Sequence, residues 1–181
     1  MLVVLLGPSG VGKSAAIERL LQDHNWTPLI SFVTRPERTG DSFKVSISEC
    51  SYDMLRSAGK LWSDVTQGKY RYALLRSEVD MAIRSSQIFV VDFAHASWKE
   101  YFSGLPHVSV YIAAETSVEL ESRLISAGRA DRLESSLRSA RELDEWYSAE
   151  GAAIGTIRLI NRTECLQELV DSIVEVAKQR Q

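Results

Sequence analysis

The chain has 181 residues, with 21 lysine and arginine residues against 24 aspartate and glutamate residues, so its formal net charge is −3. This length predicts one compact domain, and 45% hydrophobic with 25% charged residues excludes a disordered or fibrous protein. The slight negative charge argues against dependence on nonspecific nucleic-acid binding, so we expect no nucleic-acid partner. Two distant cysteines, Cys50 and Cys165, give little support to a disulfide framework or a zinc site and agree with a reducing compartment.

The longest apolar run, residues 1–6, is far shorter than the roughly 20 residues that a membrane-spanning helix needs. No basic segment precedes this run, and Gly-Pro-Ser-Gly follows where the cleavage site of a secretory leader would lie. We therefore expect a cytoplasmic protein without membrane contact, either a monomer or a homodimer.

The first predicted element is a strand at residues 2–6, whose apolar and β-branched side chains indicate burial on both faces. A glycine turn at 7–12 leads into a helix over about 13–23, with its apolar residues on one face. A second strand is predicted at 29–34. It is followed by Arg35-Pro36, where the proline disfavours helical backbone in the residue before it.

Residues 35–80 form a polar, turn-rich middle with short strands near 43–47 and 70–74 and a helix near 50–58. The remaining elements alternate between strand and helix, namely a strand at 88–92, a helix at 95–103, a strand at 108–112, a helical region at 117–150 interrupted near 127–128, a strand at 156–160 and a helix at 164–179. Apolar strands that alternate with helices indicate a parallel sheet covered on both faces. The predicted fold class is therefore α/β, with the polar middle inserted above the sheet.

The most specific motif is the glycine turn after the first strand. It matches G-x-x-x-x-G-K-[ST], directly between a strand and a helix, with Gly7, Pro8, Ser9, Gly10, Val11, Gly12, Lys13 and Ser14. Such a loop turns its N–H groups inward at the positive end of a helix, which makes a cradle for phosphate oxygens. Lys13 then supplies positive charge to the β- and γ-phosphates of ATP, and the Ser14 hydroxyl ligates Mg²⁺. The alternative, a turn that only joins strand to helix, does not require this lysine or this serine.

Asp92 ends the strand at 88–92, and parallel sheets place their ligand-binding groups at the carboxyl ends of strands. A carboxylate there is suited to hold Mg²⁺, directly or through water, so Ser14 and Asp92 are the predicted metal-binding residues. The competing interpretation of Asp92 is a cap for the helix that follows.

A second anion-binding candidate follows the strand at 29–34. Arg35 and Arg38 lie three residues apart in a turn set by Pro36 and Gly40, and two such guanidinium groups can form a fork for an anionic group. Taken alone, this cluster is more typical of a solvated turn.

The two motifs together change that interpretation. A G-P-S-G-x-G-K-S loop followed by S-x-x-T-R-x-x-R-x-G-[DE] resembles the guanylate kinase family. In that family the serine and both arginines bind the phosphate of the acceptor nucleotide, so the resemblance gives this role to Ser31, Arg35 and Arg38.

The resemblance continues further along the chain. Gly68-Lys-Tyr-Arg-Tyr72 is similar to the family's G-N-Y-Y-G segment and Val90-Val-Asp92 to its L-D-I-D segment, which adds Tyr72 and Asp92 to the predicted acceptor site. Leu159-Ile-Asn161 is similar to the family's I-V-N, so Asn161 is expected beside the base of ATP. A turn cap is the alternative for Asn161.

An arginine-rich stretch in the second half of the chain looks like the family's lid. The resemblance points to Arg123 and Arg138 as catalytic residues in addition to Lys13. Arg129, which we also predict to be catalytic, and Arg132 lie in the same stretch. Guanidinium groups in a closing lid stabilise the charge that phosphoryl transfer spreads over the moving group. The competing interpretation is a solvated helix with local ion pairs. We predict that at least two of the four arginines contact phosphate.

Departures from the family concern the acceptor base. The glutamate that reads guanine falls on Trp62 or Ser63, and the second aspartate of L-D-I-D becomes Ala94. Asp64 replaces the glutamate only if the alignment shifts. A phosphate-binding tyrosine appears as Phe43, without its hydroxyl. A site that hydrogen-bonds a base discriminates through such buried polar groups, so we expect phosphate capture with altered guanine recognition.

We therefore predict a single guanylate-kinase-like domain with a P-loop NTPase three-layer fold and a parallel central sheet. Its core comprises 1–30, 87–117 and 146–181, its acceptor-binding insertion about 31–86, and its lid about 118–145. The expected reaction transfers the γ-phosphoryl group of ATP, with Mg²⁺, to a phosphorylated small-molecule acceptor, foremost a nucleoside monophosphate. The alternatives are a kinase of the ribose 1,5-bisphosphate type, a non-catalytic guanylate-kinase-like binding module and a nucleotide-dependent switch.

Overall fold

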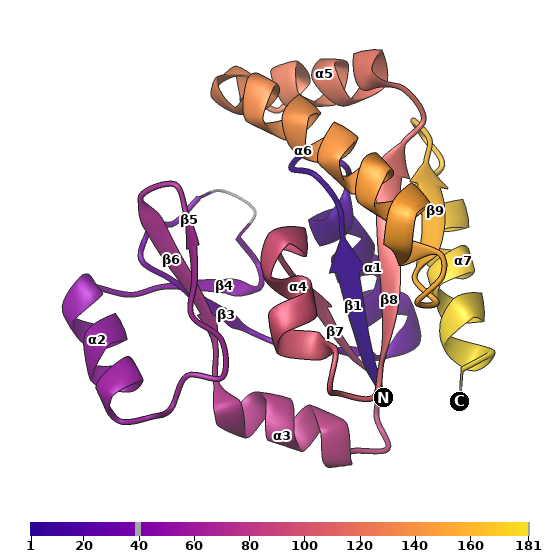
Figure 1. Ribbon diagram of the computed structural model, residues 1–181. Coiled ribbons are helices and arrows are strands. Elements are labelled where there is room, and N and C mark those ends of the chain that lie inside the picture. Colours follow the sequence, from indigo (N-terminus) through magenta and orange to yellow (C-terminus); the bar gives the residue numbers. More distant parts are fainter. Residues whose placement is uncertain (39–40, 181) are drawn as a thin grey trace.

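The computed structural model describes residues 1–38 and 41–180 (Figure 1). Its centre is a five-stranded sheet in the order β2-β7-β1-β8-β9, in which every neighbouring pair is parallel. The strands are β1 (Leu2–Leu6), β2 (Thr27–Pro28), β7 (Phe89–Asp92), β8 (His107–Ala114) and β9 (Ile157–Asn161). The predicted parallel sheet is confirmed, whereas Gly40, expected in the arginine turn, lies outside the described residues.

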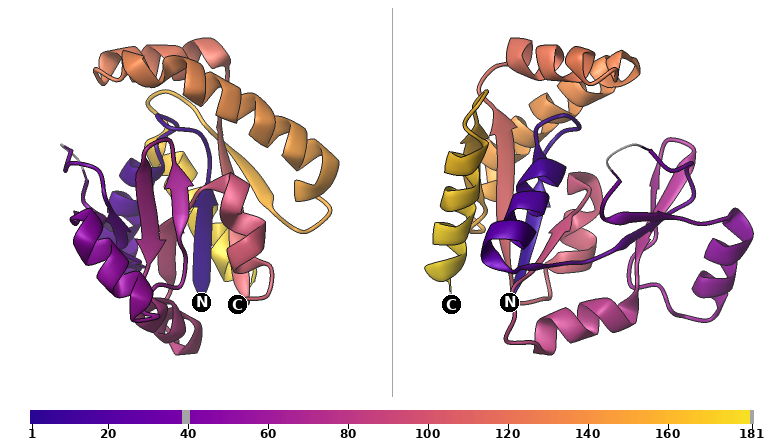
Figure 2. Two further views of the ribbon diagram at one scale, coloured as in Figure 1. Left: turned by 60° about the vertical axis from the view of Figure 1, so that its left-hand side comes forward. Right: turned by 180° about the vertical axis from the view of Figure 1, so that it is seen from behind.

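Helices cover both faces of this sheet, because successive side chains of a strand point to opposite sides. Val3 and Leu5 of β1 pack in one hydrophobic layer, and Leu2 and Val4 pack in the other. The first layer contains α1 (Lys13–His24) and α7 (Leu166–Lys178), and the second contains α3 (Arg76–Arg84) and α4 (His95–Phe102) (Figure 2). The three-layer architecture predicted from the alternation of elements is therefore confirmed.

A second sheet of four strands, in the order β4-β3-β6-β5, lies beside the core. Its elements are β3 (Ser31–Val33), β4 (Lys44–Ser46), α2 (Glu49–Ser57), β5 (Val65–Gln67) and β6 (Tyr70–Leu74). The strands near 43–47 and 70–74 and the helix near 50–58 are confirmed. From the sequence we did not predict β5 or α3, which are only 3 and 9 residues long.

The strand expected at 29–34 is confirmed only over Ser31–Val33, because the chain passes from one sheet to the other just before it. Thr27–Pro28 pairs with β7, and the Leu29 N–H still donates to the Val90 carbonyl at 2.9 Å. From Ser31 onward the chain pairs with β4 and β6 of the second sheet. Only Ser31 interrupts the apolar residues between Leu29 and Val33, so the pattern gives little sign of the change. As a result, Ser31 lies at the junction of the two sheets.

Two helices form an arm across the carboxyl ends of β1 and β8 (Figures 1 and 2). The helical arm, as we call it, consists of α5 (Ser117–Ser126), a short 3₁₀ turn (Ala130–Arg132) and α6 (Leu133–Trp146). The interruption predicted near 127–128 is confirmed, and Gly128 there has a left-handed φ of 66°. At 14 residues α6 is the longest helix described, and none of the described helices is long and apolar enough to cross a membrane.

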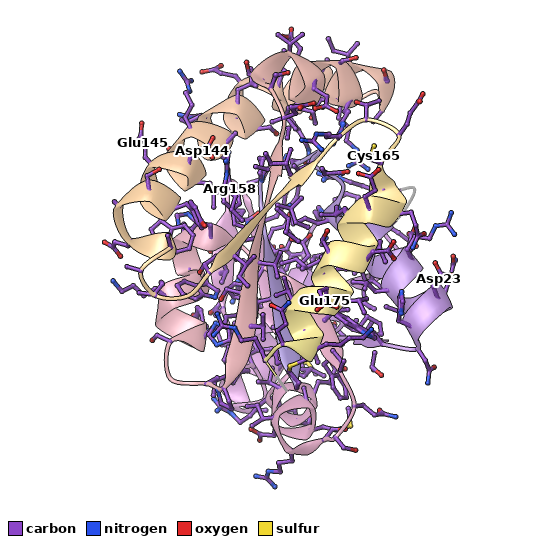
Figure 3. All side chains as sticks on the ribbon, turned by 90° about the vertical axis from the view of Figure 1, so that its right-hand side faces the viewer. Asp23, Asp144, Glu145, Arg158, Cys165 and Glu175 are labelled. Carbon is purple, nitrogen blue, oxygen red and sulfur yellow. The ribbon has the colours of Figure 1, made fainter. Side chains whose placement is uncertain are left out.

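The arm is fixed to the core at its C-terminal end. Figure 3 shows Asp144 of α6 next to Arg158 of β9, and the Arg158 Nη2 donates to Asp144 Oδ1 at 2.9 Å. The Tyr111 hydroxyl of β8 donates to the same carboxylate oxygen at 2.9 Å, and the neighbouring Leu143 is buried in the core. These contacts hold α6 over the carboxyl end of the sheet, where the glycine turn at residues 7–14, the P-loop, lies.

Candidate phosphate-binding cleft

A cleft of about 870 Å³ opens between the P-loop, the second sheet and the helical arm. The predicted site residues that line it are Gly7, Pro8, Ser9, Gly10, Gly12, Lys13, Ser14, Ser31, Arg35, Arg38, Tyr72, Asp92, Arg123 and Arg129. Val11, Arg138 and Asn161 are not among the lining residues. Residues that are far apart in the sequence are thus brought to one cavity at the carboxyl ends of β1 and β7, where open α/β sheets bind ligands.

The P-loop requires glycine at two of its positions for different reasons. Gly12 has a φ of 101°, and a Cβ at this position would collide with the Asn161 side-chain nitrogen. Gly7 lies against β8, and a Cβ there would be 2.6 Å from the Ile112 carbonyl oxygen. Side chains at either position would push the loop away from the sheet, so the glycines keep the backbone curled at the start of α1.

Lys13, the first residue of α1, folds back over this loop. Its Nζ donates to the Gly7 carbonyl at 2.6 Å and to the Pro8 carbonyl at 2.9 Å, and lies 3.8 Å from Asp92 Oδ1. Burial lowers the pKa of Lys13, and the nearby Asp92 carboxylate opposes that shift. The ammonium group is therefore held at the mouth of a backbone cradle, with one carboxylate as its counter-charge.

Asp92 ends β7 and contacts two cations. Its Oδ2 accepts from Lys44 Nζ at 3.1 Å, and its other oxygen faces Lys13. Burial works to raise the pKa of Asp92, but the positive charges of Lys13 and Lys44 outweigh it and hold the pKa below its ordinary value. Asp92 is thus an anion at neutral pH, as a magnesium ligand must be. It does not cap α4, for which no side-chain cap is found.

Arg35, which follows β3, is the most deeply buried cation on the side of the cleft formed by the second sheet. Only 3% of it is exposed, and its two terminal nitrogens donate to the two oxygens of Asp41 at 2.5 and 2.7 Å. The backbone N–H of Arg38 donates to the same carboxylate at 2.9 Å. Burial works to raise the pKa of Asp41, but the hydrogen bonds from Arg35 and Arg38 outweigh it and lower the pKa. The Nε of Arg35 is buried without a partner among residues 1–38 and 41–180, so the side chain keeps donor capacity.

The helical arm contributes three arginines to the cleft. Arg123 is tied to the loop region, because its Nη2 donates to the Asn161 carbonyl at 2.8 Å and to Glu119 at 2.6 Å. Arg132 lies beside the P-loop, 3.5 Å from the Ser9 hydroxyl, and Arg129 also lines the cavity. Arg138 is exposed on α6 and does not line the cleft, since the cleft-facing side of that helix carries three serines, Glu142 and Leu143 instead.

Asn161, at the end of β9, supports the P-loop from below. Its side-chain nitrogen donates to the Val11 carbonyl at 2.8 Å, and the residue is 6% exposed. The side-chain oxygen of Asn161, Oδ1, is buried with no partner in the described part of the chain. The contact with Val11 shows that Asn161 braces the P-loop. Binding of the donor base by Asn161 stays a prediction.

The positions expected to read a guanine base carry no carboxylate that faces the cleft. Ser63 lines the cleft, but it is 1% exposed and its hydroxyl accepts from the Leu74 N–H at 3.0 Å. Ala94 also lines the cleft, and Trp62 packs against Phe102 with ring centroids 4.8 Å apart.

Asp64 is directed elsewhere. Its carboxylate accepts from the Tyr52 hydroxyl at 2.8 Å and from Arg56 Nε at 3.0 Å, beside α2, and it does not line the cleft.

Sequence reasoning missed one charged residue of the site, Lys44. It belongs to no motif and follows the arginine turn on β4, where it pairs in register with Ser31. The only signal was its polarity in a short predicted strand, which is equally typical of a solvent-facing position.

Comparison with known proteins agrees with this architecture. No family model matches the chain. The guanylate kinase of Brucella melitensis is 30% identical over 158 residues, covering 81% of this chain and 71% of that protein. The guanylate kinase of a Nostoc strain is 27% identical over 154 residues, covering 82% and 77%. Among solved structures, the guanylate kinase from Anaplasma phagocytophilum has a TM-score of 0.67 at 16% identity, over 100% of this chain and 86% of that one. A gluconokinase from Sinorhizobium meliloti has a TM-score of 0.53 at 15% identity, over 98% and 92%.

Proposed function

This chain belongs to the guanylate kinase family of phosphotransferases, and from that premise we propose that it transfers the γ-phosphoryl group of ATP to a phosphate-bearing acceptor, foremost a nucleoside monophosphate. One observation carries the proposal. Lys13 of the P-loop and Arg35 of the turn after β3, two buried cations from different segments, line the same cleft. A kinase needs one anion site for the donor and another for the acceptor, and this cleft provides both.

The P-loop residues fit a nucleoside triphosphate. The left-handed backbone at Gly12 and the inward-folded Lys13 make an anion cradle at the start of a helix. ATP bound with Mg²⁺ supplies the transferable phosphoryl group and part of the charge neutralisation. Mg²⁺ in such sites keeps several waters and takes one or two protein ligands, so Ser14 and Asp92 are sufficient. No cluster of three metal-ligating side chains occurs among the residues that the structure describes, and none is required.

The proposed reaction is a direct in-line displacement without a covalent enzyme intermediate. An oxygen of the acceptor phosphate forms a bond to the γ-phosphorus, while the bond from the γ-phosphorus to the bridging oxygen of ADP breaks. The chain contributes positioning and positive charge: Lys13 on the donor side, Arg35 and Arg38 on the acceptor side. Arg123, Arg129 and Arg132 of the helical arm add charge where the cleft is covered, and closure of the arm and the second sheet would exclude water.

The wall of the acceptor side supports a change in base recognition. Ser63 uses its hydroxyl internally, Ala94 has no polar side chain, and Asp64 is engaged with Tyr52 and Arg56. Without a carboxylate facing the cleft at these positions, the hydrogen bonds expected to select guanine are lost, and discrimination between bases falls. The same observation favours a second candidate, a phosphosugar kinase whose acceptor has no base, as for ribose 1,5-bisphosphate. A non-catalytic binding module has no need of Lys13 or Ser14.

The test is an ADP-release assay with ATP and Mg²⁺ across GMP, dGMP, AMP, CMP, UMP, dTMP and ribose 1,5-bisphosphate, with Lys13→Ala as the blank. We expect turnover on at least one acceptor, lost in Lys13→Ala and reduced in Arg35→Ala. Turnover on ribose 1,5-bisphosphate alone would support the phosphosugar alternative. ATP binding without turnover on any acceptor would contradict the kinase proposal and support a binding module or a switch.

A further inference from the structure

Lys44 connects the donor side of the cleft to the acceptor side. It lies on β4 of the second sheet, yet its ammonium group crosses to the core sheet and donates to Asp92 at 3.1 Å. On its own sheet it is in register with Ser31. A small pocket beneath the cleft is bordered by Ser14, Ser31, Lys44 and Asp92 together. Lys44 therefore stands where residues assigned to the donor and residues assigned to the acceptor meet.

The charges around Lys44 leave it available to an anion. Asp92 is shared between Lys44 and Lys13, so one carboxylate faces two ammonium groups and one positive charge is unbalanced. The neighbouring Arg35 is already neutralised by its two hydrogen bonds with Asp41. About a fifth of the Lys44 side chain is exposed, and the residue lines the cleft.

We propose that Lys44 is a further catalytic residue, whose ammonium group contacts both the acceptor phosphate and the phosphoryl group in transfer. Two phosphates that approach each other repel, and a cation between them lowers that repulsion most when they are closest. This inference rests on the proposed kinase function. The competing explanation is a strut, in which the Lys44–Asp92 pair only holds the two sheets together.

The probe is a polyphosphate that reaches from the donor site toward the acceptor site. Calorimetric binding of ATP is compared with that of adenosine 5′-tetraphosphate, whose additional phosphate extends past the γ-position, in the wild type, Lys44→Gln and Lys44→Arg. Lys69→Gln is the matched control, because Lys69 also lines the cleft but lies at the exposed β5–β6 turn.

We expect the wild type and Lys69→Gln to bind the tetraphosphate about tenfold more tightly than ATP, the size of one charge-assisted hydrogen bond. Lys44→Gln should lose most of this preference, and Lys44→Arg should keep part of it. A wild type that binds both probes equally would overturn the proposal without any variant. So would a preference that Lys44→Gln retains, since a strut changes both affinities alike.

The two proposals fail separately. A chain that shows the Lys44-dependent preference but no turnover on any acceptor would support the contact and contradict the kinase function. A chain that turns over an acceptor without that preference would support the kinase function and contradict the role of Lys44.

Discussion

The two sides of the cleft hold their anion-binding groups by different means. On the donor side the backbone does so: Lys13 is bonded to the carbonyls of its own loop, and Gly12 gives that loop its left-handed turn. On the acceptor side, paired side chains do so: Asp41 holds Arg35, and Asp92 holds Lys44. The donor side therefore depends on single residues that no other residue type can replace, whereas the acceptor side depends on pairs of side chains that can be substituted together.

Loss of the P-loop ammonium group should have the largest effect. Lys13→Ala is expected to reduce kcat/KM by about 10³-fold, because the developing charge on the transferred phosphoryl group loses a preorganised cation. ADP release with a working acceptor measures this effect, and thermal unfolding confirms that the variant is folded. The control Lys60→Ala removes an exposed lysine outside the cleft and should retain full activity. Activity within tenfold of wild type in Lys13→Ala would remove the basis for the donor side.

Adding a Cβ atom inside the phosphate cradle should have the next largest effect. Gly12→Ala forces a left-handed backbone on alanine and a collision with Asn161, so ATP affinity should fall by about 10²-fold. Gly59→Ala is matched, since Gly59 has a φ of 65° but open space around it. That control should lose about 1 kcal/mol of stability and no ATP affinity. Equal losses of affinity in both variants would mean that backbone strain, and not the cradle, explains the result.

Arg35→Ala should affect the acceptor and spare the donor. We expect kcat/KM for the acceptor to fall by about 10²-fold with the KM for ATP unchanged, because a charged hydrogen-bonding fork is removed. Arg35→Lys should recover only a small part, since lysine has no planar fork. A parallel rise in the KM for ATP would show that Arg35 belongs to both sides of the cleft.

The Arg35–Asp41 pair should also appear in the pH dependence of stability. The folded-state pKa of Asp41 lies below its ordinary value of 3.8, so the pair contributes fully above about pH 4 and its contribution is lost as the pH falls through the folded pKa. Asp41→Asn should therefore be about 2 kcal/mol less stable than wild type at pH 7, with a difference that narrows at acid pH. Urea unfolding at several pH values measures this, and a pH-independent difference would indicate a packing effect.

The smallest effect should come from Asp64. Because its carboxylate contacts Tyr52 and Arg56 outside the cleft, Asp64→Asn should leave the ratio of kcat/KM values between acceptor bases unchanged. Its stability should fall by about 1 kcal/mol through the weakened contact with Tyr52. A changed base preference, measured with the same acceptor panel, would show that Asp64 reaches the base after all.

The P-loop, the parallel sheet and the break in the helical arm were predictable because local rules determine them. Glycine spacing, buried apolar runs and Gly128 each act within a few residues. The change of sheet between Pro28 and Ser31 was not predictable, since both sheets accept the same apolar run. Arg138 was assigned on resemblance, and its exposure depends on how α6 is rotated against the core.

Lys44 shows the limit most clearly. Its partner Asp92 is 48 positions away in the sequence, and the contact exists only because β4 and β7, from different sheets, end at the same place. No pattern of neighbouring residues in the sequence predicts such a contact. Asp41, by contrast, occupies the acidic position of the arginine motif, six residues from Arg35, so its contact with Arg35 is local in the sequence.

Discrimination between acceptor bases is the sharpest test of phosphate capture without guanine recognition. The measurement is the ratio of kcat/KM for GMP to that for AMP in the wild-type chain, at saturating ATP and Mg²⁺. With phosphate capture by Arg35 and no carboxylate of the second sheet facing the base, we expect a ratio below about 10². A ratio of about 10⁴ or more would contradict this expectation, because only hydrogen-bonding groups aimed at guanine supply discrimination of that size.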